Sequence, residues 1–198
     1  QGRDWERYAL IKARPVTGDP QRAQELMASL RPFVYRRYVD FGVIESLRGM
    51  KQMINTEVRR RGLQDNIKLG HGGIREVEFI AQCFQLIRGG RDLGLQQREL
   101  LLVLAECVTL GCLPPAAATE LRAAYLFLRD SEHAIQGYQD QQTQDLPQAD
   151  LPRAALATVM GFTSWEDFVT ALDGHRQVVA RHFRELIAAP EEDDPSAA

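Results

Sequence analysis

Apolar residues recur every three or four positions along most of the chain, and this spacing constrains the fold more than any other feature. Ile74, Val77 and Ile80, for example, fall on one face of an α-helix. No stretch alternates apolar and polar residues for long enough to predict a strand. We therefore predict an all-α fold, a multi-helix bundle of roughly five to eight mostly antiparallel helices.

Proline, glycine and polar runs divide this pattern into helical segments. Pro32 is predicted to break a helix or to start a new one, and Ser164 with Asp167 three residues later predicts a capping box. Residues 1–188 are expected to form a single helical domain, followed by an acidic flexible tail at 189–198. The predicted helical segments are 3–13, 21–39, 43–61, 73–88, 96–111, 115–138, 152–160 and 164–188.

Composition excludes several classes of protein. Hydrophobic residues make up 44% and charged residues 26%, which is ordinary globular usage and excludes a wholly disordered or collagen-like chain. Cys83, Cys107 and Cys112 are too few for a disulfide framework and lack zinc-ligand spacing, so we predict three reduced, mostly buried thiols in a cytosolic protein and no metal site. Large aromatic residues at helical spacing are predicted core anchors: Trp5, Tyr8, Trp165 and Phe168.

The beginning of the chain shows no targeting segment. No apolar run approaches the roughly 20 residues of a membrane helix, so no membrane association is expected. The first nine residues, QGRDWERYA, contain no apolar stretch, and a signal peptide is therefore not expected. Because the first residue is Gln1 and not Met, we expect a piece of a longer chain.

Charge is distributed unevenly around the net value of -3. Residues 1–75 contain 15 Lys and Arg against 8 Asp and Glu, whereas residues 76–198 contain 9 against 19. Arg outnumbers Lys by 21 to 3, and its planar donor fork suits carboxylates and phosphates. Two interpretations of this basic part stay open. It binds a phosphate-bearing ligand, or its Arg side chains line solvated helix faces. The negative net charge and the lack of any RNA or DNA motif argue against nucleic-acid binding.

Three glycines in four residues precede the helical segment 73–88, within the sequence NIKLGHGGIREVEF that starts at Asn66. Such a loop permits close backbone approach, and a helix N-terminus offers amides to an anion. Lys68 and Arg75 add positive charge on either side. The pattern is neither a P-loop nor a dinucleotide fingerprint. It predicts either a tight connection between helices or an anion site.

The helix after this loop carries polar residues on one side. Arg75, Glu78 and Gln82 share one narrow sector at 100° per residue. Glu76 lies at the border of the apolar face, where a carboxylate forms a structural ion pair with a neighbouring helix or faces a cleft.

Several motifs together resemble one family. The run NIKLGHGGIREVEFIAQ, the opening GRDWERYALIKAR, the stretch RPFVYRRYVDFGVIESLRGMK and the pair AYLFLRDSEHAIQ and Asp140–Thr143 are similar to the bifunctional glutamine synthetase adenylyltransferase/adenylyl-removing enzymes. The form IREVEF resembles the first of that family's two halves, which removes AMP from glutamine synthetase by phosphorolysis to ADP. The uridylyltransferase of the PII protein carries a looser relative of the motif.

The resemblance implies the helical region that follows the family's first nucleotidyltransferase domain. That domain places metal-binding aspartates after a Gly-Ser turn, and no such motif occurs in this chain. Two-metal chemistry needs those carboxylates. We therefore expect Mg²⁺ and ATP or ADP to be used by the full enzyme, with none held tightly by this chain, no metal ligands in it and no turnover by it alone.

The resemblance also implies candidate site residues, although packing between domains is an equally good interpretation of them. Glu76 and Glu78 are expected to orient cations in a supporting catalytic role. The residues expected to lie at the interdomain cleft or to contact phosphate groups are Glu6, Arg7, Lys12, Lys68, Gly70, Gly72, Gly73 and Arg75.

Expected partners follow from the same resemblance. They are glutamine synthetase, the PII signalling protein and the enzyme's own nucleotidyltransferase domains, in a bacterial cytoplasm. A second class of function stays open, in which the chain is a non-catalytic interaction module for glutamine synthetase or the PII protein.

Overall fold

The computed structural model describes residues 4–36 and 62–188, together with the single positions 49, 53, 56, 58 and 60. These parts contain helices and no strand, so the all-α prediction is confirmed. Three short 3-10 helices, η1 (Leu63–Asp65), η2 (Leu93–Leu95) and η3 (Tyr138–Asp140), lie between the longer ones. The α-helices are α1 (Asp4–Leu10), α2 (Pro20–Val34), α4 (Ile74–Arg88), α5 (Leu100–Thr109), α6 (Pro115–Gly137), α7 (Asp150–Val159) and α8 (Trp165–Ala188).

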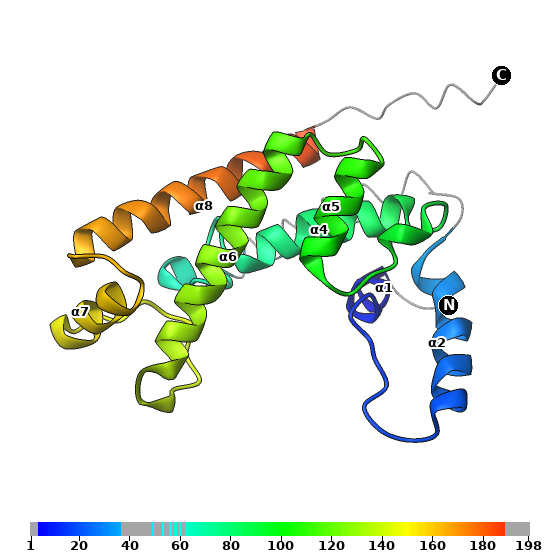
Figure 1. Cartoon of the computed structure of the whole chain (residues 1–198), viewed down its shortest axis with the longest axis horizontal. Coiled ribbons are helices and arrows are strands. Elements are labelled where there is room, and N and C mark those ends of the chain that lie inside the picture. Colours follow the sequence, from blue (N-terminus) through cyan, green and yellow to red (C-terminus); the bar gives the residue numbers. More distant parts are fainter. Residues whose placement is uncertain are drawn as a thin grey trace.

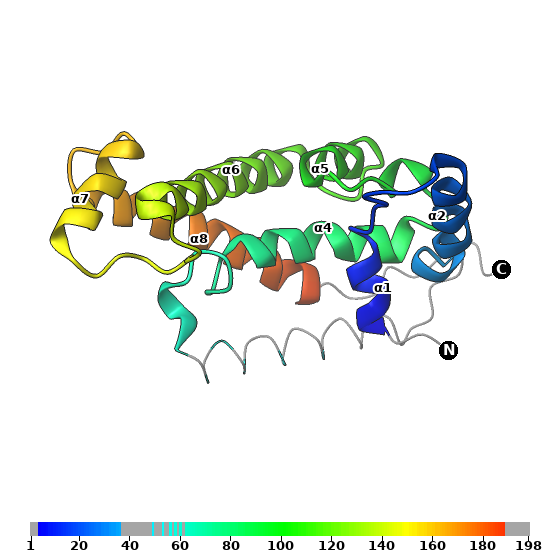
Figure 2. The same ribbon diagram turned by 90° about the horizontal axis from the view of Figure 1, so that it is seen from below.

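The helices form an elongated body with two layers (Figures 1 and 2). Helices α5 and α6 lie in one layer, and α4 and α8 lie in the other (Figure 2). Helix α6 packs against α8, which also contacts α4 and α7. Helices α1 and α2 lie at one end and α7 at the other (Figure 2). The start of α4 therefore lies in the middle of the molecule, where loops from distant parts of the sequence can reach it.

One cluster of buried apolar side chains includes residues of α2, α4, α5, α6, α7 and α8, and Tyr8 and Leu10 of α1 pack against it. Phe79 of α4 packs against Tyr8 of α1 and Phe183 of α8, with ring centroids 5.8 and 5.3 Å apart. Phe127 of α6 and Phe168 of α8 stack at 5.9 Å. Burial of such large rings supplies much of the hydrophobic stabilisation of a bundle, because each removes a large apolar area from water.

Most predicted helix ends agree with the structure to within a few residues, but the interpretation of Pro32 is wrong. Helix α2 continues through Pro32 and ends at Val34, where the amide of Tyr35 donates to the carbonyl of Arg31 at 2.8 Å. A proline in the last turn removes only one helical hydrogen bond, which the end of a helix tolerates. Ser164 does cap α8, because its hydroxyl accepts a hydrogen bond from the amide of Asp167 at 3.0 Å.

Two predicted segments lie mainly or wholly outside the described residues. In the predicted helix 43–61, only positions 49, 53, 56, 58 and 60 are described, and all five are helical. The predicted acidic tail, 189–198, is not among the described residues.

Among the predicted core anchors, Phe168 is fully buried and Tyr8 and Trp165 pack against the core. Trp5 is different: it is 57% exposed, so its prediction as a core anchor is wrong. Cys83 and Cys107 are buried and Cys112 is half-buried, and all three are free thiols. In the described parts, each helix is too short or too polar to cross a membrane.

Candidate functional site

The glycine loop, residues 66–73, is built around the side chain of Asn66. The Oδ1 atom of Asn66 accepts hydrogen bonds from the amides of Lys68 and Leu69 at 3.1 and 2.8 Å. Its backbone carbonyl accepts from the amide of Gly70 at 2.8 Å and from the guanidinium of Arg176 at 3.2 Å. Asn forms such local turns readily because its short side chain reaches backbone amides two and three residues ahead. The loop is therefore tightly wound.

Close packing explains why the loop contains glycine. Gly72 has φ +68°, and a Cβ atom there would lie 2.2 Å from the carbonyl oxygen of Arg176 in α8. A Cβ atom on Gly70 would lie 2.5 Å from the carbonyl oxygen of Asn66. Neither contact is possible for a larger residue without moving backbone. The prediction of a tight connection is confirmed at these positions.

The amides of the three loop glycines are already used inside the loop. Gly70 donates to Asn66, Gly73 donates to the carbonyl of Gly70 at 3.0 Å, and Gly72 donates to the carboxylate of Glu76 at 3.0 Å. An anion would have to replace one of these bonds. A phosphate contact from the loop glycines stays a prediction, and side chains nearby are better placed for the role.

The glycine loop also pairs with a second loop that is far away in the sequence. We call residues 138–149 the connector, since they join α6 to α7. Asn66 and Asp145 form an isolated antiparallel bridge, and the side-chain amide of Asn66 donates to the Asp145 carboxylate at 2.7 Å. The amide of Ile67 donates to the carbonyl of Gln144 at 2.8 Å. The glycine motif thus lies against Gln144 and Asp145, the residues that directly follow the motif Asp140–Thr143.

A buried carboxylate ties the glycine loop to α6. Glu132 is only 2% exposed, and its carboxylate lies 3.5 Å from the ammonium of Lys68 and accepts a short hydrogen bond from Arg129. A buried charge needs such partners, because removing it from water without them is costly. Lys68 therefore has a structural role in addition to any contact with a ligand.

Glu76 turns back toward the loop that precedes its helix. It is 8% exposed, and one carboxylate oxygen lies 3.3 Å from Nδ1 of His71 while the other accepts from Gly72. A carboxylate in the first turn of a helix is also favoured by the helix dipole. Glu76 also lines a cavity of about 960 Å³ together with His71 and Arg176, so it both supports the loop and faces a cleft, as the sequence predicted.

The outer side of α4 presents the predicted polar sector to α1. Arg75 is exposed and forms no ion pair with any residue in the described parts, and Glu78 is half-buried. Burial raises the pKa of the Tyr8 phenol well above its usual value, while the nearby Arg75 charge lowers this pKa and Glu78 raises it. Gln82, one turn further on, is buried, and its side-chain oxygen has no hydrogen-bond partner in the described structure.

The three candidate residues in or just after α1 lie in different environments. Arg7 is 2% exposed and donates to the carbonyls of Phe33 and Val34 at 3.1 and 3.2 Å. These carbonyls are at the C-terminal end of α2, where a guanidinium is favoured. Lys12 is exposed and donates to the carbonyl of Arg98 at 2.5 Å, and Glu6 is half-buried. Arg7 thus joins α1 to α2, which is a packing contact.

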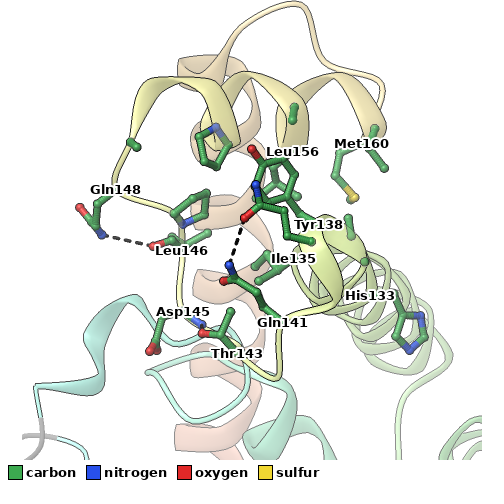
Figure 3. A pocket seen from close by; sticks show the side chains of 18 of the residues that line it. His133, Ile135, Tyr138, Gln141, Thr143, Asp145, Leu146, Gln148, Leu156 and Met160 are labelled. Carbon is green, nitrogen blue, oxygen red and sulfur yellow. Dashed lines mark hydrogen bonds between the residues drawn. The ribbon is translucent and has the colours of Figure 1, made fainter.

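A groove that the sequence did not predict lies between α6, the connector and α7 (Figure 3). Its volume is about 1030 Å³. Its lining combines apolar side chains, such as Ile135 of α6, Leu146 of the connector and Leu156 of α7, with polar ones such as Tyr138 and Gln141 (Figure 3). Gln139 and Asp140 have φ values of +57° and +51°, which residues other than glycine rarely adopt. The polar run 139–150 was the only signal in the sequence, and it does not distinguish a groove from a plain linker.

The described residues contain no group of three or more His, Cys, Asp or Glu side chains that could hold a metal ion.

Comparison with known proteins shows the family to which the chain belongs. A model of the GlnD PII-uridylyltransferase family matches residues 48–187. The chain is 60% identical over 198 residues to the bifunctional glutamine synthetase adenylyltransferase/adenylyl-removing enzyme of Pseudomonas aeruginosa, covering 100% of this chain and 20% of that protein. The enzymes of the same name from Pseudomonas putida and Nitrosococcus oceani are each 59% identical over 98% of this chain and 20% of their own length.

The chain thus spans about a fifth of the length of the curated relatives it matches. The match runs through the glycine loop, the outer side of α4 and the connector, so it includes every part of the site described above. The chain belongs to the family described by the GlnD PII-uridylyltransferase model, and over its whole length it is similar to a segment of the bifunctional glutamine synthetase adenylyltransferase/adenylyl-removing enzymes.

Proposed function

We propose that this chain is the helical part of an enzyme that reversibly adenylylates glutamine synthetase, and that it belongs to the half that removes AMP. The names of its relatives support the first statement. The IREVEF form of the α4 sequence, in which Arg75 is the second residue after Gly73, supports the second by resemblance. The full enzyme would act in the bacterial cytoplasm, with glutamine synthetase and the PII signalling protein as partners and with ATP or ADP as nucleotides.

In the proposed reaction an oxygen of inorganic phosphate attacks the phosphorus of the AMP group on a tyrosine of glutamine synthetase. The bond between that phosphorus and the tyrosine oxygen breaks, ADP leaves, and the tyrosine oxygen takes up a proton. Negative charge is spread over the transferring phosphoryl oxygens, and cations held nearby stabilise it. Mg²⁺, when bound to the carboxylates of the nucleotidyltransferase domain, supplies further charge neutralisation.

Arg75 carries this proposal within the chain. Its guanidinium is exposed at the first turn of α4, beside Tyr8 of α1, and it has no ion-pair partner in the described parts. By resemblance, α1 is the segment that follows directly on the catalytic domain. A free guanidinium at that junction can form two parallel hydrogen bonds to a phosphate group. Lys68 is the second candidate, but a phosphate would have to compete with Glu132 for its ammonium.

The other candidate residues have supporting roles in this proposal. Glu78 lies one turn after Arg75 on the same side of α4, from which it would orient the Arg75 guanidinium once a phosphate is bound. Glu76 holds the glycine loop through His71 and Gly72. Gly70, Gly72 and Gly73 give the loop its shape. Arg7 fixes α1 against α2, and Glu6 and Lys12 lie on or after α1, where the enzyme's own nucleotidyltransferase domain would pack.

The test is Arg75→Ala in the full-length enzyme, with ADP release from adenylylated glutamine synthetase as the measurement. We expect kcat/KM to fall by about 100-fold, as when one charged donor to a transition state is removed. Arg122→Ala is the matched control, because Arg122 is another exposed arginine on a helix of the described structure. Adenylylation by the second half should be unchanged. Normal ADP release by the Arg75 variant would refute the phosphate role.

The groove favours a second candidate function, an interaction module that binds glutamine synthetase or the PII protein. It is large and mostly apolar, and one of the residues that line it, Gln139, has a left-handed backbone conformation. The test is Tyr138→Ala, since Tyr138 lies in the groove (Figure 3). Weaker binding of one partner in a titration, with ADP release unchanged when that partner is absent, would support this candidate. Unchanged binding of both partners would contradict it.

A further inference from the structure

Two cysteines are brought together at the end of α5. Gly111 has φ +69°, the amide of Cys112 donates to the carbonyl of Cys107 at 3.0 Å, and the amide of Gly111 donates to the carbonyl of Val108 at 3.0 Å. This is a Schellman motif, in which the residues five apart at the end of a helix come into side-chain contact. In most proteins both positions are simply apolar. Here both are cysteine.

The geometry of this turn permits a covalent bond between the two sulfur atoms. Standard bond lengths together with the 3.0 Å hydrogen bond keep the two Cα atoms within about 7 Å of each other. Disulfides are found at Cα separations of about 4.4 to 6.8 Å. The Cys112 thiol donates a hydrogen bond to the carbonyl oxygen of Cys107 at 3.3 Å, which keeps its Sγ atom beside Cys107. Rotation of the two side chains is the movement that a disulfide would require.

The two cysteines differ in access to solvent. Cys107 is fully buried in the core, whereas Cys112 is half-buried at the surface of the turn between α5 and α6. A small oxidant would therefore reach Cys112 first, and Cys107 would lie directly behind it. Cys83 is also buried, but no thiol partner is found for it in the described parts.

The surroundings of Cys112 lower the pKa of its thiol to about 7 and so favour the thiolate. The hydrogen bond from the Cys107 thiol is the largest influence and lowers the pKa of Cys112; burial and the Asp92 charge raise this pKa, and the Arg88 charge lowers it. Arg88 comes from the end of α4 and Asp92 from the turn after it, and Glu106 of α5 is the remaining charge near the pair. Burial raises the pKa of Cys83, so that thiol stays protonated. The thiolate is the reactive form of cysteine.

We propose that Cys107 and Cys112 form a reversible disulfide and make the junction of α5 and α6 a site of modification by peroxide. The Cys112 thiolate attacks one oxygen of hydrogen peroxide, the O–O bond breaks, and hydroxide leaves a sulfenic acid on Cys112. The Cys107 sulfur then attacks the Cys112 sulfur, the S–O bond breaks and water leaves as the Cys107 proton is lost. Two electrons pass from the thiols to the peroxide, which becomes two water molecules.

The full-length enzyme is the material for the test. Trypsin would release residues 99–122 as one peptide, because no Lys or Arg lies between Arg98 and Arg122, and this peptide contains both cysteines. The folded enzyme is treated with hydrogen peroxide and then unfolded in denaturant with N-ethylmaleimide, so that the buried Cys107 is alkylated too, and its peptides are weighed. We expect the peptide to change from doubly alkylated to unalkylated and two hydrogens lighter, and dithiothreitol should restore the double alkylation.

Single variants separate the roles of the two thiols. Cys107→Ser should leave a sulfenic acid on Cys112 that a 1,3-dione reagent traps, whereas Cys112→Ser should leave Cys107 unmodified. Cys83→Ser is the matched control and should form the disulfide as the parent does. The proposal is wrong if the peptide stays doubly alkylated at peroxide concentrations that oxidise a small thiol, or if the Cys107→Ser variant shows no trapped sulfenic acid.

Discussion

The glycine loop and the connector meet at the Asn66–Asp145 bridge, and both contain left-handed backbone, but for different reasons. The glycine loop is pressed against α8, and glycine stands where a Cβ atom would collide with backbone. The connector bends at Gln139 and Asp140, two exposed residues that hold a left-handed backbone without glycine. The first bend is required by packing. The second borders an open groove, and strained backbone at an open surface is more often connected with function.

The strongest test of this comparison is Gly72→Ala. The new Cβ atom would meet the carbonyl of Arg176 at 2.2 Å, and φ at this position is +68°. Since the obstacle is backbone of α8, we expect a loss of about 3 kcal/mol or more in the free energy of unfolding. Urea unfolding followed by circular dichroism measures it.

Gly174→Ala is the control for this change. Gly174 is within α8, and a Cβ atom there meets nothing within 4 Å. Replacing a helical glycine with alanine should raise stability by about 0.5–1 kcal/mol. If Gly72→Ala is as well tolerated as Gly174→Ala, packing against α8 does not require glycine at position 72.

The next largest effect is expected at the bridge itself. Asn66→Ala removes the acceptor of the Lys68 and Leu69 amides and the donor to Asp145 at a position that is 5% exposed. Leaving buried polar groups without partners costs about 1–3 kcal/mol each, so we expect a total loss near the upper end of that range. Asp145→Ala, which removes only one of these bonds from a less buried residue, should cost less. The same unfolding measurement compares them, and equal losses would show that Asn66 is not the centre of the loop.

Much of the fold follows from the sequence, because periodicity and helix-end signals are local. The pairs Gly89-Gly90 and Pro114-Pro115 mark helix boundaries within a residue or two of where the structure has them. The helix after the glycine loop and the face it buries were predicted for the same reason.

The contacts that make the site could not be predicted in this way. The bridge from Asn66 to Asp145 joins residues 79 positions apart, and a helical pattern says nothing about which loops meet. Arg7 is buried although arginine is mostly a surface residue, because the carbonyls at the end of α2 accept its hydrogen bonds. Trp5 is exposed although tryptophan packs well, and helical spacing alone does not show which face the core covers.

A smaller effect is expected in the connector. Gln139→Gly removes the steric cost of the left-handed conformation, at φ +57° and ψ +25°, and adds some flexibility to the unfolded chain. We expect stability to rise by up to about 1 kcal/mol, the opposite sign to Gly72→Ala. If the bend is kept for binding, affinity for the groove's partner should fall in the same variant. A loss of stability would mean that the Gln139 side chain, which accepts a bond from Gln141 at 3.3 Å, supports the bend.

The smallest expected effect is the contribution of His175, on α8, to the pH dependence of stability. The buried acids near the glycine loop, Glu76 and Glu132, have cationic or amide partners, whereas His175 of α8 stacks on Phe127 of α6 with ring centroids 4.4 Å apart. Burial lowers the pKa of His175 below its ordinary value. Below the unfolded-state pKa of about 6.5, the unfolded chain therefore binds more protons than the folded chain, and stability falls as pH falls. Above that pH, His175 adds no pH dependence to the stability.

Urea unfolding at several pH values should show this decrease in the parent and a weaker one in His175→Phe, which keeps the ring contact without the titrating group. An equal decrease in both proteins would show that carboxylates, and not His175, cause the loss of stability at low pH.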